Sequence, residues 1–349
     1  MEKPGQGKNG KITINENRTI SATPGVSLLQ ALKENGVFLP SACGGHGVCG
    51  LCRVQVLEGA AIPLTPAETA HLNPTEQQNN IRLACQVKLE QTGGMAARDL
   101  RISIPEQSLH VREYRATVAN IRDLTRNIKE ISLDLVKPQA ITFKSGQYIQ
   151  LRIPPYPGNK KMTYRAYSIA SAPAEQKNIE LEVAYTPNGI ATTYLFEHLK
   201  KGDSVVFNGP HGDFFLRDSE KSIVMVAGGS GMAPIKSMLT DLRDRNIKRK
   251  IRFFFGGRAP ADIFYADLMS SFERAFPDFR FIPTVDSKRP EEKWDGNTGL
   301  VTDIIDRQVE EGFGGEAYLC GSPAMIEACL KILRRKKIPE ERIFYDKFA

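Results

Sequence analysis

Four cysteines in the first quarter of the chain have types and spacing that suit an inorganic cluster. Cys43, Cys49 and Cys52 share one glycine-rich loop, and Cys85 follows further along the chain. An iron–sulfur cluster needs four thiolates that converge on one small core. Glycines let such a loop adopt unusual backbone angles, so that backbone N–H groups can point at the cluster sulfurs. The pattern therefore predicts a four-cysteine iron–sulfur site.

Two other kinds of metal site use similar residues. A structural zinc site also takes four cysteines, but such sites usually present two C-x2-C pairs, and this chain has only one. His46 suggests a Rieske centre, which needs two histidines in place of two cysteines, so we interpret His46 as a loop residue. A zinc-stapled binding module joined to a nucleotide-sensing domain stays open as the alternative function.

A second set of residues suits a flavin nucleotide. Arg165-Ala166-Tyr167-Ser168 lies on a predicted strand, along which side chains alternate in direction. Gly189, with Thr192 and Thr193 after it, is placed to open a helix, where free N–H groups and hydroxyls suit a pyrophosphate. Each feature alone is also explained by a surface ion pair, a core tyrosine or a helix cap, so only the combination favours a flavin site.

A third set follows the predicted strand 223–227. The glycines of residues 228–234 permit close approach of a diphosphate to the start of a helix, and a proline is tolerated at a first helical position. This loop reads G-x-G-x-x-P, so it departs from the Rossmann fingerprint at the third glycine. The candidate dinucleotide contacts are Gly229, Gly231, Met232 and Pro234.

Three residues near the later strands complete the candidates. Cys320 occupies a predicted strand-to-helix turn, and Phe348 is the penultimate residue. Taken alone, Cys320 would be a small buried hydrophobe and Phe348 a frayed end. Arg258 follows two glycines where a Rossmann site would present an acid to the ribose. Because Arg258 could accept a 2′-phosphate, NADPH stays open as the alternative to NADH.

The composition of the chain indicates what kind of protein positions these residues. The chain has 349 residues, of which 41% are hydrophobic and 25% charged, so it can bury more than one core. Its mean hydropathy of -0.31 and its lack of long apolar runs predict no membrane span. Residues 1–5 show no secretory signal, so we expect a cytoplasmic protein with unpaired cysteines. The net charge of +7 is spread out, which excludes a nucleic-acid arm.

The patterning divides the chain into three expected domains. Residues 1–106 begin with a hairpin and a short helix capped by Ser27, and form a small, mostly β domain with one or two helices. Residues 107–218 show short strands between Pro and Gly turns, which favours an antiparallel barrel. Residues 219–349 alternate apolar strands with helices, which favours a parallel α/β domain. The fold class is therefore α+β and α/β, multidomain.

The cysteine motif resembles the 2Fe-2S ferredoxins over about residues 11–105, although its first gap has five residues where the plant-type pattern has four. That resemblance implies a β-grasp domain in which Cys43, Cys49, Cys52 and Cys85 hold the cluster.

The flavin and nucleotide motifs resemble those of the ferredoxin-NADP reductase superfamily, whose barrel carries FAD. This resemblance implies that Arg165 holds the pyrophosphate, Tyr167 packs against the isoalloxazine and Ser168 bonds near flavin N5. It also implies that Cys320 borders the nicotinamide and that Phe348 shields the flavin face. Thr192 stands where the family often has serine, an exchange that keeps the hydroxyl.

The order of the three domains resembles the NADH-dependent reductases of oxygenase systems and the F component of Na+-translocating NADH:quinone reductases, without the membrane helix of the latter. The resemblance implies that a hydride passes from NADH to FAD and that single electrons leave through the cluster. The implied catalytic residues are Cys320 and Ser168. The acceptor would be an oxygenase component, another electron carrier, a corrinoid protein or a quinone.

Overall fold

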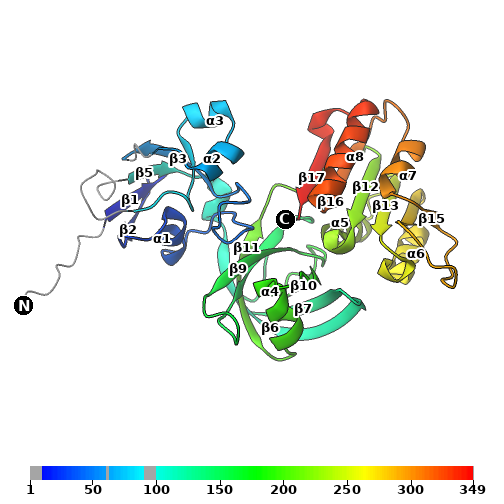
Figure 1. Cartoon of the computed structure of the whole chain (residues 1–349), viewed down its shortest axis with the longest axis horizontal. Coiled ribbons are helices and arrows are strands. Elements are labelled where there is room, and N and C mark those ends of the chain that lie inside the picture. Colours follow the sequence, from blue (N-terminus) through cyan, green and yellow to red (C-terminus); the bar gives the residue numbers. More distant parts are fainter. Residues whose placement is uncertain (1–9, 60–62, 90–99, 349) are drawn as a thin grey trace, which may run out of the picture.

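The strands of the chain form three sheets that follow one another along the sequence (Figure 1). The computed structural model describes residues 10–59, 63–89 and 100–348. The first residues of the chain, on which the prediction of no secretory signal rests, lie outside this part. One hydrophobic cluster fills the first unit, a second fills the barrel, and two more cover the faces of the last sheet. The multidomain α+β and α/β class is thus confirmed.

The first sheet has the strand order β2-β1-β5-β3-β4. Its strands are β1 (Gly10–Ile14), β2 (Arg18–Ala22), β3 (Arg53–Glu58), β4 (Ile81–Leu83) and β5 (Leu100–Ser103). β1 and β2 form the predicted antiparallel hairpin, and β1 pairs in parallel with β5. Helix α1 (Leu28–Glu34) buries Leu28 and Leu32 in the core of this unit. A mixed sheet beneath one helix is the arrangement expected of a β-grasp domain.

Three helices are present in the described part of this unit, so the expectation of one or two was too low. The predicted helix is capped as expected, since the Ser27 hydroxyl accepts a hydrogen bond from the Gln30 N–H. The additional helices are α2 (Pro66–His71) and α3 (Pro74–Gln78), which follow Thr65 and Asn73. Both caps form reciprocal hydrogen bonds with a glutamate three residues later, which stabilises even these short helices.

The second sheet is antiparallel and curls into the predicted barrel. Its order is β10-β7-β6-β11-β8-β9, and a bridge between Ile169 and Leu181 joins the two edges. Ile149, Leu151 and Phe207 lie in its core. The strands are β6 (Arg112–Thr125), β7 (Ile128–Lys137), β8 (Tyr148–Ile153), β9 (Thr163–Ser168), β10 (Asn178–Ala184) and β11 (Ser204–His211). The short helix α4 (Ile190–Thr193) follows β10.

The third sheet is parallel throughout, in the order β15-β14-β13-β12-β16-β17. Its strands are β12 (Ile223–Gly228), β13 (Ile251–Gly257), β14 (Phe279–Val285), β15 (Asn297–Thr298), β16 (Glu316–Gly321) and β17 (Ile343–Lys347).

Helices cover both faces of this third sheet. Met225 packs in one cluster with side chains of α5 (Met232–Asp244) and α6 (Ala266–Ala275). The neighbouring Val224 and Val226 pack on the other face, against α7 (Val301–Gln308) and α8 (Pro323–Arg335). The carboxyl ends of the parallel strands are therefore free to meet a ligand at one edge. Within the described ranges, no helix is both long and apolar enough to cross a bilayer.

Candidate functional site

The cysteine loop and Cys85, which follows β4, bring four sulfur atoms together in two pairs. The Sγ atoms of Cys43 and Cys49 lie 3.3 Å apart. Cys52 and Cys85 interact in the same way, and all four are free thiols. Over the residues that the structure describes, no three Cys, His, Asp or Glu side chains surround a single ion position. A two-iron cluster, in which each iron takes two thiolates, fits a paired arrangement of sulfurs.

Backbone amides of the loop favour thiolates at this site. The hydrogen bond from Cys49, together with the N–H groups of Val48 and Gly45, lowers the pKa of Cys43 to about 4. The pKa of Cys49 is raised in turn, because its proton is shared with Cys43. Gly44 has a φ of 69°, a left-handed conformation that glycine adopts without strain. These features agree with the expectation that the glycines aim N–H groups at a negatively charged core.

The predicted flavin strand lies directly against this loop. β9 pairs with β8 so that Arg165 faces Leu151 and Tyr167 faces Ile149. Arg165 donates hydrogen bonds from Nη1 to the carbonyl oxygen of Cys43 at 3.3 Å and to that of Tyr164 at 2.8 Å. One residue assigned to FAD therefore touches the backbone of one assigned to the cluster.

The turn after β10 opens a helix at the predicted place. α4 begins after Gly189 and has only four residues. The Thr192 hydroxyl donates to the carbonyl oxygen of Thr186 at 2.9 Å and accepts from the N–H of the same residue. Thr192 therefore shapes the turn itself, whereas Thr193 is half-buried and more accessible. The assignment of both hydroxyls to a pyrophosphate stays a prediction.

The glycine turn after β12 lies against the end of β16, where Cys320 is a strand residue and not, as the sequence had suggested, part of the turn that follows. Residues 229–231 form a 3₁₀ turn that leads directly into α5. A side chain at Gly231 would collide with the carbonyl oxygen of Cys320. α5 begins at Met232, so Pro234 is its third residue and not its first, as the sequence had suggested. The position still tolerates proline, because the first N–H groups of a helix have no partner within it.

The last residues of the chain lie beside Cys320. In the register of β16 and β17, Cys320 lies beside Asp346, and the Phe348 N–H donates to the carbonyl oxygen of Gly321. Burial raises the pKa of the Cys320 thiol well above its usual value, with Asp346 and Glu182 adding to the shift. The thiol is therefore a neutral group at the strand ends, which suits contact with an uncharged ring.

Arg258 lies at the same edge of the sheet and is exposed. The Asp262 carboxylate accepts hydrogen bonds from the backbone N–H groups of Arg258 and Ala259, at 3.1 and 3.0 Å. These bonds fix the backbone of the loop and leave the guanidinium accessible. A role of Arg258 in accepting a 2′-phosphate stays a prediction.

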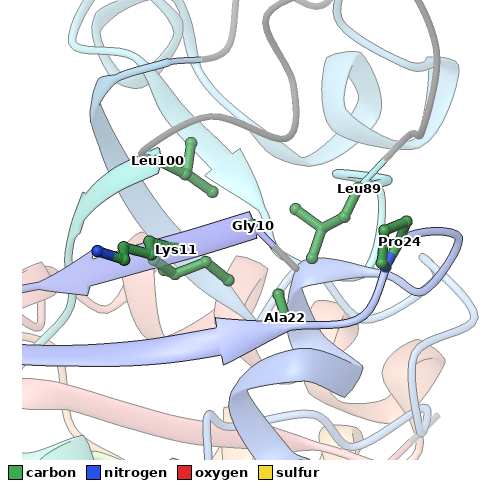
Figure 2. A pocket seen from close by; sticks show the side chains of 7 residues that line it. Gly10, Lys11, Ala22, Pro24, Leu89 and Leu100 are labelled. Atoms are coloured by element: carbon green, nitrogen blue, oxygen red, sulfur yellow. The ribbon is translucent and has the colours of Figure 1, made fainter. Parts of the chain in front are cut away.

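Two small cavities do not add a ligand site. One, of about 10 Å³, lies between β1, β2 and Leu89, and Figure 2 shows its largely apolar lining. The other, of about 20 Å³, is lined by Lys33, Leu39 and Gln150, among others, where the first unit meets the barrel. Each volume is comparable with a single water molecule.

Four residues near these motifs escaped sequence reasoning, and Glu182 shows why. Glu182 belongs to an alternating stretch, Ile179 to Val183, that reads as a strand with a solvated face. The structure covers that face with α5, so Glu182 is buried and Glu180 is only partly exposed. No local pattern reveals a contact between domains. The four residues are Gln150, Glu182, Lys236 and Asp346.

Family models account for each of the three sheets. Residues 12–90 match the 2Fe-2S iron-sulfur cluster binding domain. Residues 115–216 match the oxidoreductase FAD-binding domain, and residues 225–331 the oxidoreductase NAD-binding domain.

Whole-chain relatives share this organisation. The F component of the Na(+)-translocating NADH-quinone reductase of Methylococcus capsulatus is 33% identical, over 98% of this chain and 92% of that protein. The phenol hydroxylase P5 protein of Acinetobacter pittii is 36% identical, over 95% of this chain and 91% of that protein. The solved structure of the Amycolatopsis cytochrome P450 reductase GcoB aligns with a TM-score of 0.77 and 30% identity, covering 97% of this chain and 98% of that chain.

Fold, site and similarity together define an electron-transfer flavoprotein of the oxidoreductase class. The chain belongs to the family of NADH-dependent reductases that join a 2Fe-2S cluster-binding domain to FAD- and NAD-binding domains. Its cofactors are FAD and a 2Fe-2S cluster, with NADH as the electron donor. The alternative of a zinc-stapled binding module is not favoured.

Proposed function

We propose that this reductase passes electrons from NADH, through FAD and then the cluster, to a protein acceptor. The observation that carries this order is the hydrogen bond from Arg165 to the carbonyl oxygen of Cys43. It joins the candidate flavin strand to the candidate cluster loop without an intervening element. Electrons that enter at the nucleotide domain would therefore leave through the first domain.

The site residues divide between three tasks in this proposal. Each task uses the chemistry that its side chains present. Cluster binding falls to Cys43, Cys49, Cys52 and Cys85. FAD binding falls to Arg165, Ala166, Tyr167, Ser168, Gly189, Thr192, Thr193 and Phe348. Binding of the nicotinamide nucleotide falls to Gly229, Gly231, Met232, Pro234, Arg258 and Cys320.

FAD supplies the conversion between a hydride and single electrons, which neither the nicotinamide nor the cluster can perform. The protein contributes position. Cys320 and the glycine turn pack together at the ends of β16 and β12, because Gly231 has no side chain to meet the carbonyl oxygen of Cys320. Ser168 ends β9, beside Tyr148 of β8, and is almost fully buried. In this role Cys320 and Ser168 would exclude water from the place where the nicotinamide and the flavin react.

A protein acceptor is favoured by the surface of the cluster loop. Val48 and Leu51, on either side of Cys49, have exposed fractions of 64% and 38%. Exposed apolar side chains beside a redox centre suit transient docking of a protein. The phenol hydroxylase P5 protein and the P450 reductase, by their names, serve oxygenases. A quinone is the second candidate, because the F component of the quinone reductase is similarly related over the whole chain.

We also propose domain boundaries near residues 106 and 218, and a cytoplasmic location. The boundaries are supported because they fall between the matched ranges 12–90, 115–216 and 225–331. The location is supported by the free cysteines, which suit a reducing compartment.

The test is anaerobic reduction of the holoenzyme by NADH, followed by addition of cytochrome c or a water-soluble quinone as probes. Cys49→Ser should preserve flavin reduction and abolish electron transfer to cytochrome c. Val48→Ser, which removes the exposed apolar side chain without adding a charge, should weaken docking of cytochrome c and leave reduction of the small quinone unchanged. Intact transfer in Cys49→Ser would contradict the proposed route.

A further inference from the structure

One buried carboxyl group lies where the barrel meets the nucleotide domain and makes no hydrogen bond of ordinary geometry to any residue that the structure describes. Glu182 is 3% exposed, and neither of its carboxyl oxygen atoms has a hydrogen-bond partner among the described residues. Burying an unpaired carboxyl group is costly, so its presence calls for an explanation. Glu182 has no role in the proposed binding of the cluster, FAD or the nucleotide.

Strand register places Glu182 between residues of the candidate site. The bridge between Ile169 and Leu181, with the bond from the Ala170 N–H to the Glu180 carbonyl oxygen, brings Ser168 next to Glu182 across the β9–β10 pair. β10 also packs against the glycine turn at residues 229–231. Glu182 is close enough to Cys320 to contribute to the pKa shift of that thiol. The carboxyl group is thus bracketed by residues of both the flavin and the nicotinamide motifs.

Charged groups connect this position to the surface. Glu130 lies directly opposite Glu182 on β7. Lys236, in the first turns of α5, contacts Glu130 at 3.2 Å and Glu180 at 2.8 Å. The Tyr265 hydroxyl donates a hydrogen bond to Glu130.

The end of this cluster that lies farthest from Glu182 is exposed to solvent. Glu130 also pairs at 2.9 Å with Arg122, whose side chain is 55% exposed. The cluster therefore extends from the neighbourhood of Glu182 and Cys320 to a solvent-exposed side chain.

The reaction releases a proton that cannot leave through the cluster. A hydride carries two electrons and a proton, but the cluster removes only electrons. When the electrons leave, the proton that came with them must leave separately. We infer that Glu182 is a proton-transfer residue of this reductase: its carboxylate accepts the proton that stays behind when electrons pass to the cluster, and the Tyr265, Glu130 and Lys236 cluster passes it to solvent. The bond between hydrogen and flavin breaks, a carboxyl O–H bond forms, and one proton enters water per NADH oxidised.

The surroundings suit a group that gains and loses a proton. Burial raises the pKa of Glu182 to about 8, an effect opposed by Lys236 and the nearby Tyr265 hydroxyl and increased by Glu130 and Glu180. The other titratable groups in this region are Tyr265 on the approach to α6, Cys320 on β16 and Asp346 on β17. A proton acceptor works best when its pKa lies near the working pH. The accepting, ionised form becomes more abundant as pH rises through the pKa of about 8.

The inference rests on the proposed function, and the experiment separates the two. Stopped-flow records of the holoenzyme follow flavin reduction by NADH and then flavin reoxidation by cytochrome c, while an indicator dye records proton release. Glu182→Gln should leave flavin reduction within about twofold and slow reoxidation and proton release by about 100-fold. It should also abolish the rise of reoxidation rate with pH. Glu182→Asp should restore part of that rise.

Glu180→Gln is the structural control, since it perturbs the same cluster and keeps the carboxyl group at position 182. It should retain the pH dependence of reoxidation. Wild-type timing of proton release in Glu182→Gln, or equal slowing of both half-reactions in both variants, would overturn the inference. Failure of NADH to reduce the unsubstituted protein would overturn the proposed function, and this inference with it.

Discussion

The Gln150 side chain, in the middle of β8, donates a hydrogen bond from Nε2 to the carbonyl oxygen of Leu39 at 2.9 Å. Leu39 leads into the cluster loop, and Gln150 is only 3% exposed. The bond joins the barrel to the cluster-binding unit in the same region as the contact of Arg165 with Cys43. Lys33 of α1 adds a cation–π contact with the Tyr164 ring. These contacts fix the position of the cluster loop on the barrel.

Replacing Gln150 should therefore slow only electron transfer from the flavin to the cluster. In Gln150→Leu, the buried Leu39 carbonyl loses its partner and the loop can shift away from β8. Small displacements of reacting groups have large kinetic effects, so we expect cluster reduction by the flavin to slow by about 10-fold, with flavin reduction by NADH unchanged. Stopped-flow absorbance separates the two steps.

The matched control is Gln55→Leu. Gln55 also donates its side-chain amide to a backbone carbonyl, that of Asn79, but both residues lie within the first unit. It should leave both steps unchanged. Equal rates of cluster reduction in Gln150→Leu and in the unsubstituted protein would show that this contact does not position the loop.

Gly231 should be essential for binding of the nicotinamide nucleotide and dispensable for binding of FAD and the cluster. In Gly231→Ala, the new methyl group meets the carbonyl oxygen of Cys320, which forces the turn away from β16. We expect the rate of flavin reduction by NADH to fall by at least about 10-fold, while FAD and iron contents stay unchanged. Gly314→Ala is the control, because open space surrounds that position. Normal reduction of Gly231→Ala would place the nucleotide elsewhere.

Arg258 should determine how well NADPH competes with NADH. Removing its charge in Arg258→Ala should lower kcat/KM for NADPH by about 10-fold, the value of one charge-assisted hydrogen bond, and change that for NADH little. Steady-state reduction of cytochrome c with each nucleotide measures the ratio. Lys248→Ala, which removes a cation outside the candidate site, is the control. An unchanged ratio in Arg258→Ala would exclude contact with a 2′-phosphate.

A buried ion pair should control the stability of the cluster-binding unit. Glu68 is fully buried and accepts hydrogen bonds from Arg82 at 2.8 Å and 2.9 Å. In Glu68→Gln the buried guanidinium of Arg82 loses the negative charge of Glu68, and we expect the free energy of unfolding to fall by about 3–5 kcal/mol. Glu76→Gln, at a partly exposed pair with Arg53, should cost below about 1 kcal/mol. Denaturant titration followed by circular dichroism measures both.

The same pair predicts the direction of a pH effect. Burial opposes ionisation of Glu68, but hydrogen bonds from Arg82 and from the N–H groups of Thr65 and Leu83 outweigh it and lower the pKa. A carboxyl group with a lower pKa in the folded state stabilises the fold above its unfolded pKa of about 4.3 and loses that effect as pH falls. Stability should therefore decline below about pH 4 in the unsubstituted protein, and less steeply in Glu68→Gln.

Local patterns predicted the elements of the fold well. The hairpin of β1 and β2, the Ser27 cap and the apolar strands β12 and β13 each follow from neighbours in the sequence. Thr65 and Asn73, each followed three residues later by glutamate, form the capping pattern that starts α2 and α3. The cysteine spacing predicted four sulfurs in one place because three of them share a short loop.

Contacts between domains could not be predicted in the same way. Gln150 and Glu182 alternate with apolar residues on their strands, and such positions normally face water. Only the packing of α1 and the cluster loop against β8, and of α5 against β10, buries them. That packing depends on residues far away along the chain, which no sequence period encodes.

The most direct test of the proposed electron route, from NADH through FAD to the cluster, is freeze-quench electron paramagnetic resonance after anaerobic mixing of the holoenzyme with NADH. The account predicts that flavin absorbance bleaches first and that the signal of a reduced 2Fe-2S cluster appears afterwards, at a rate that Gln150→Leu lowers. A cluster that stays oxidised while the flavin is fully reduced, or one that is reduced before the flavin, would contradict it.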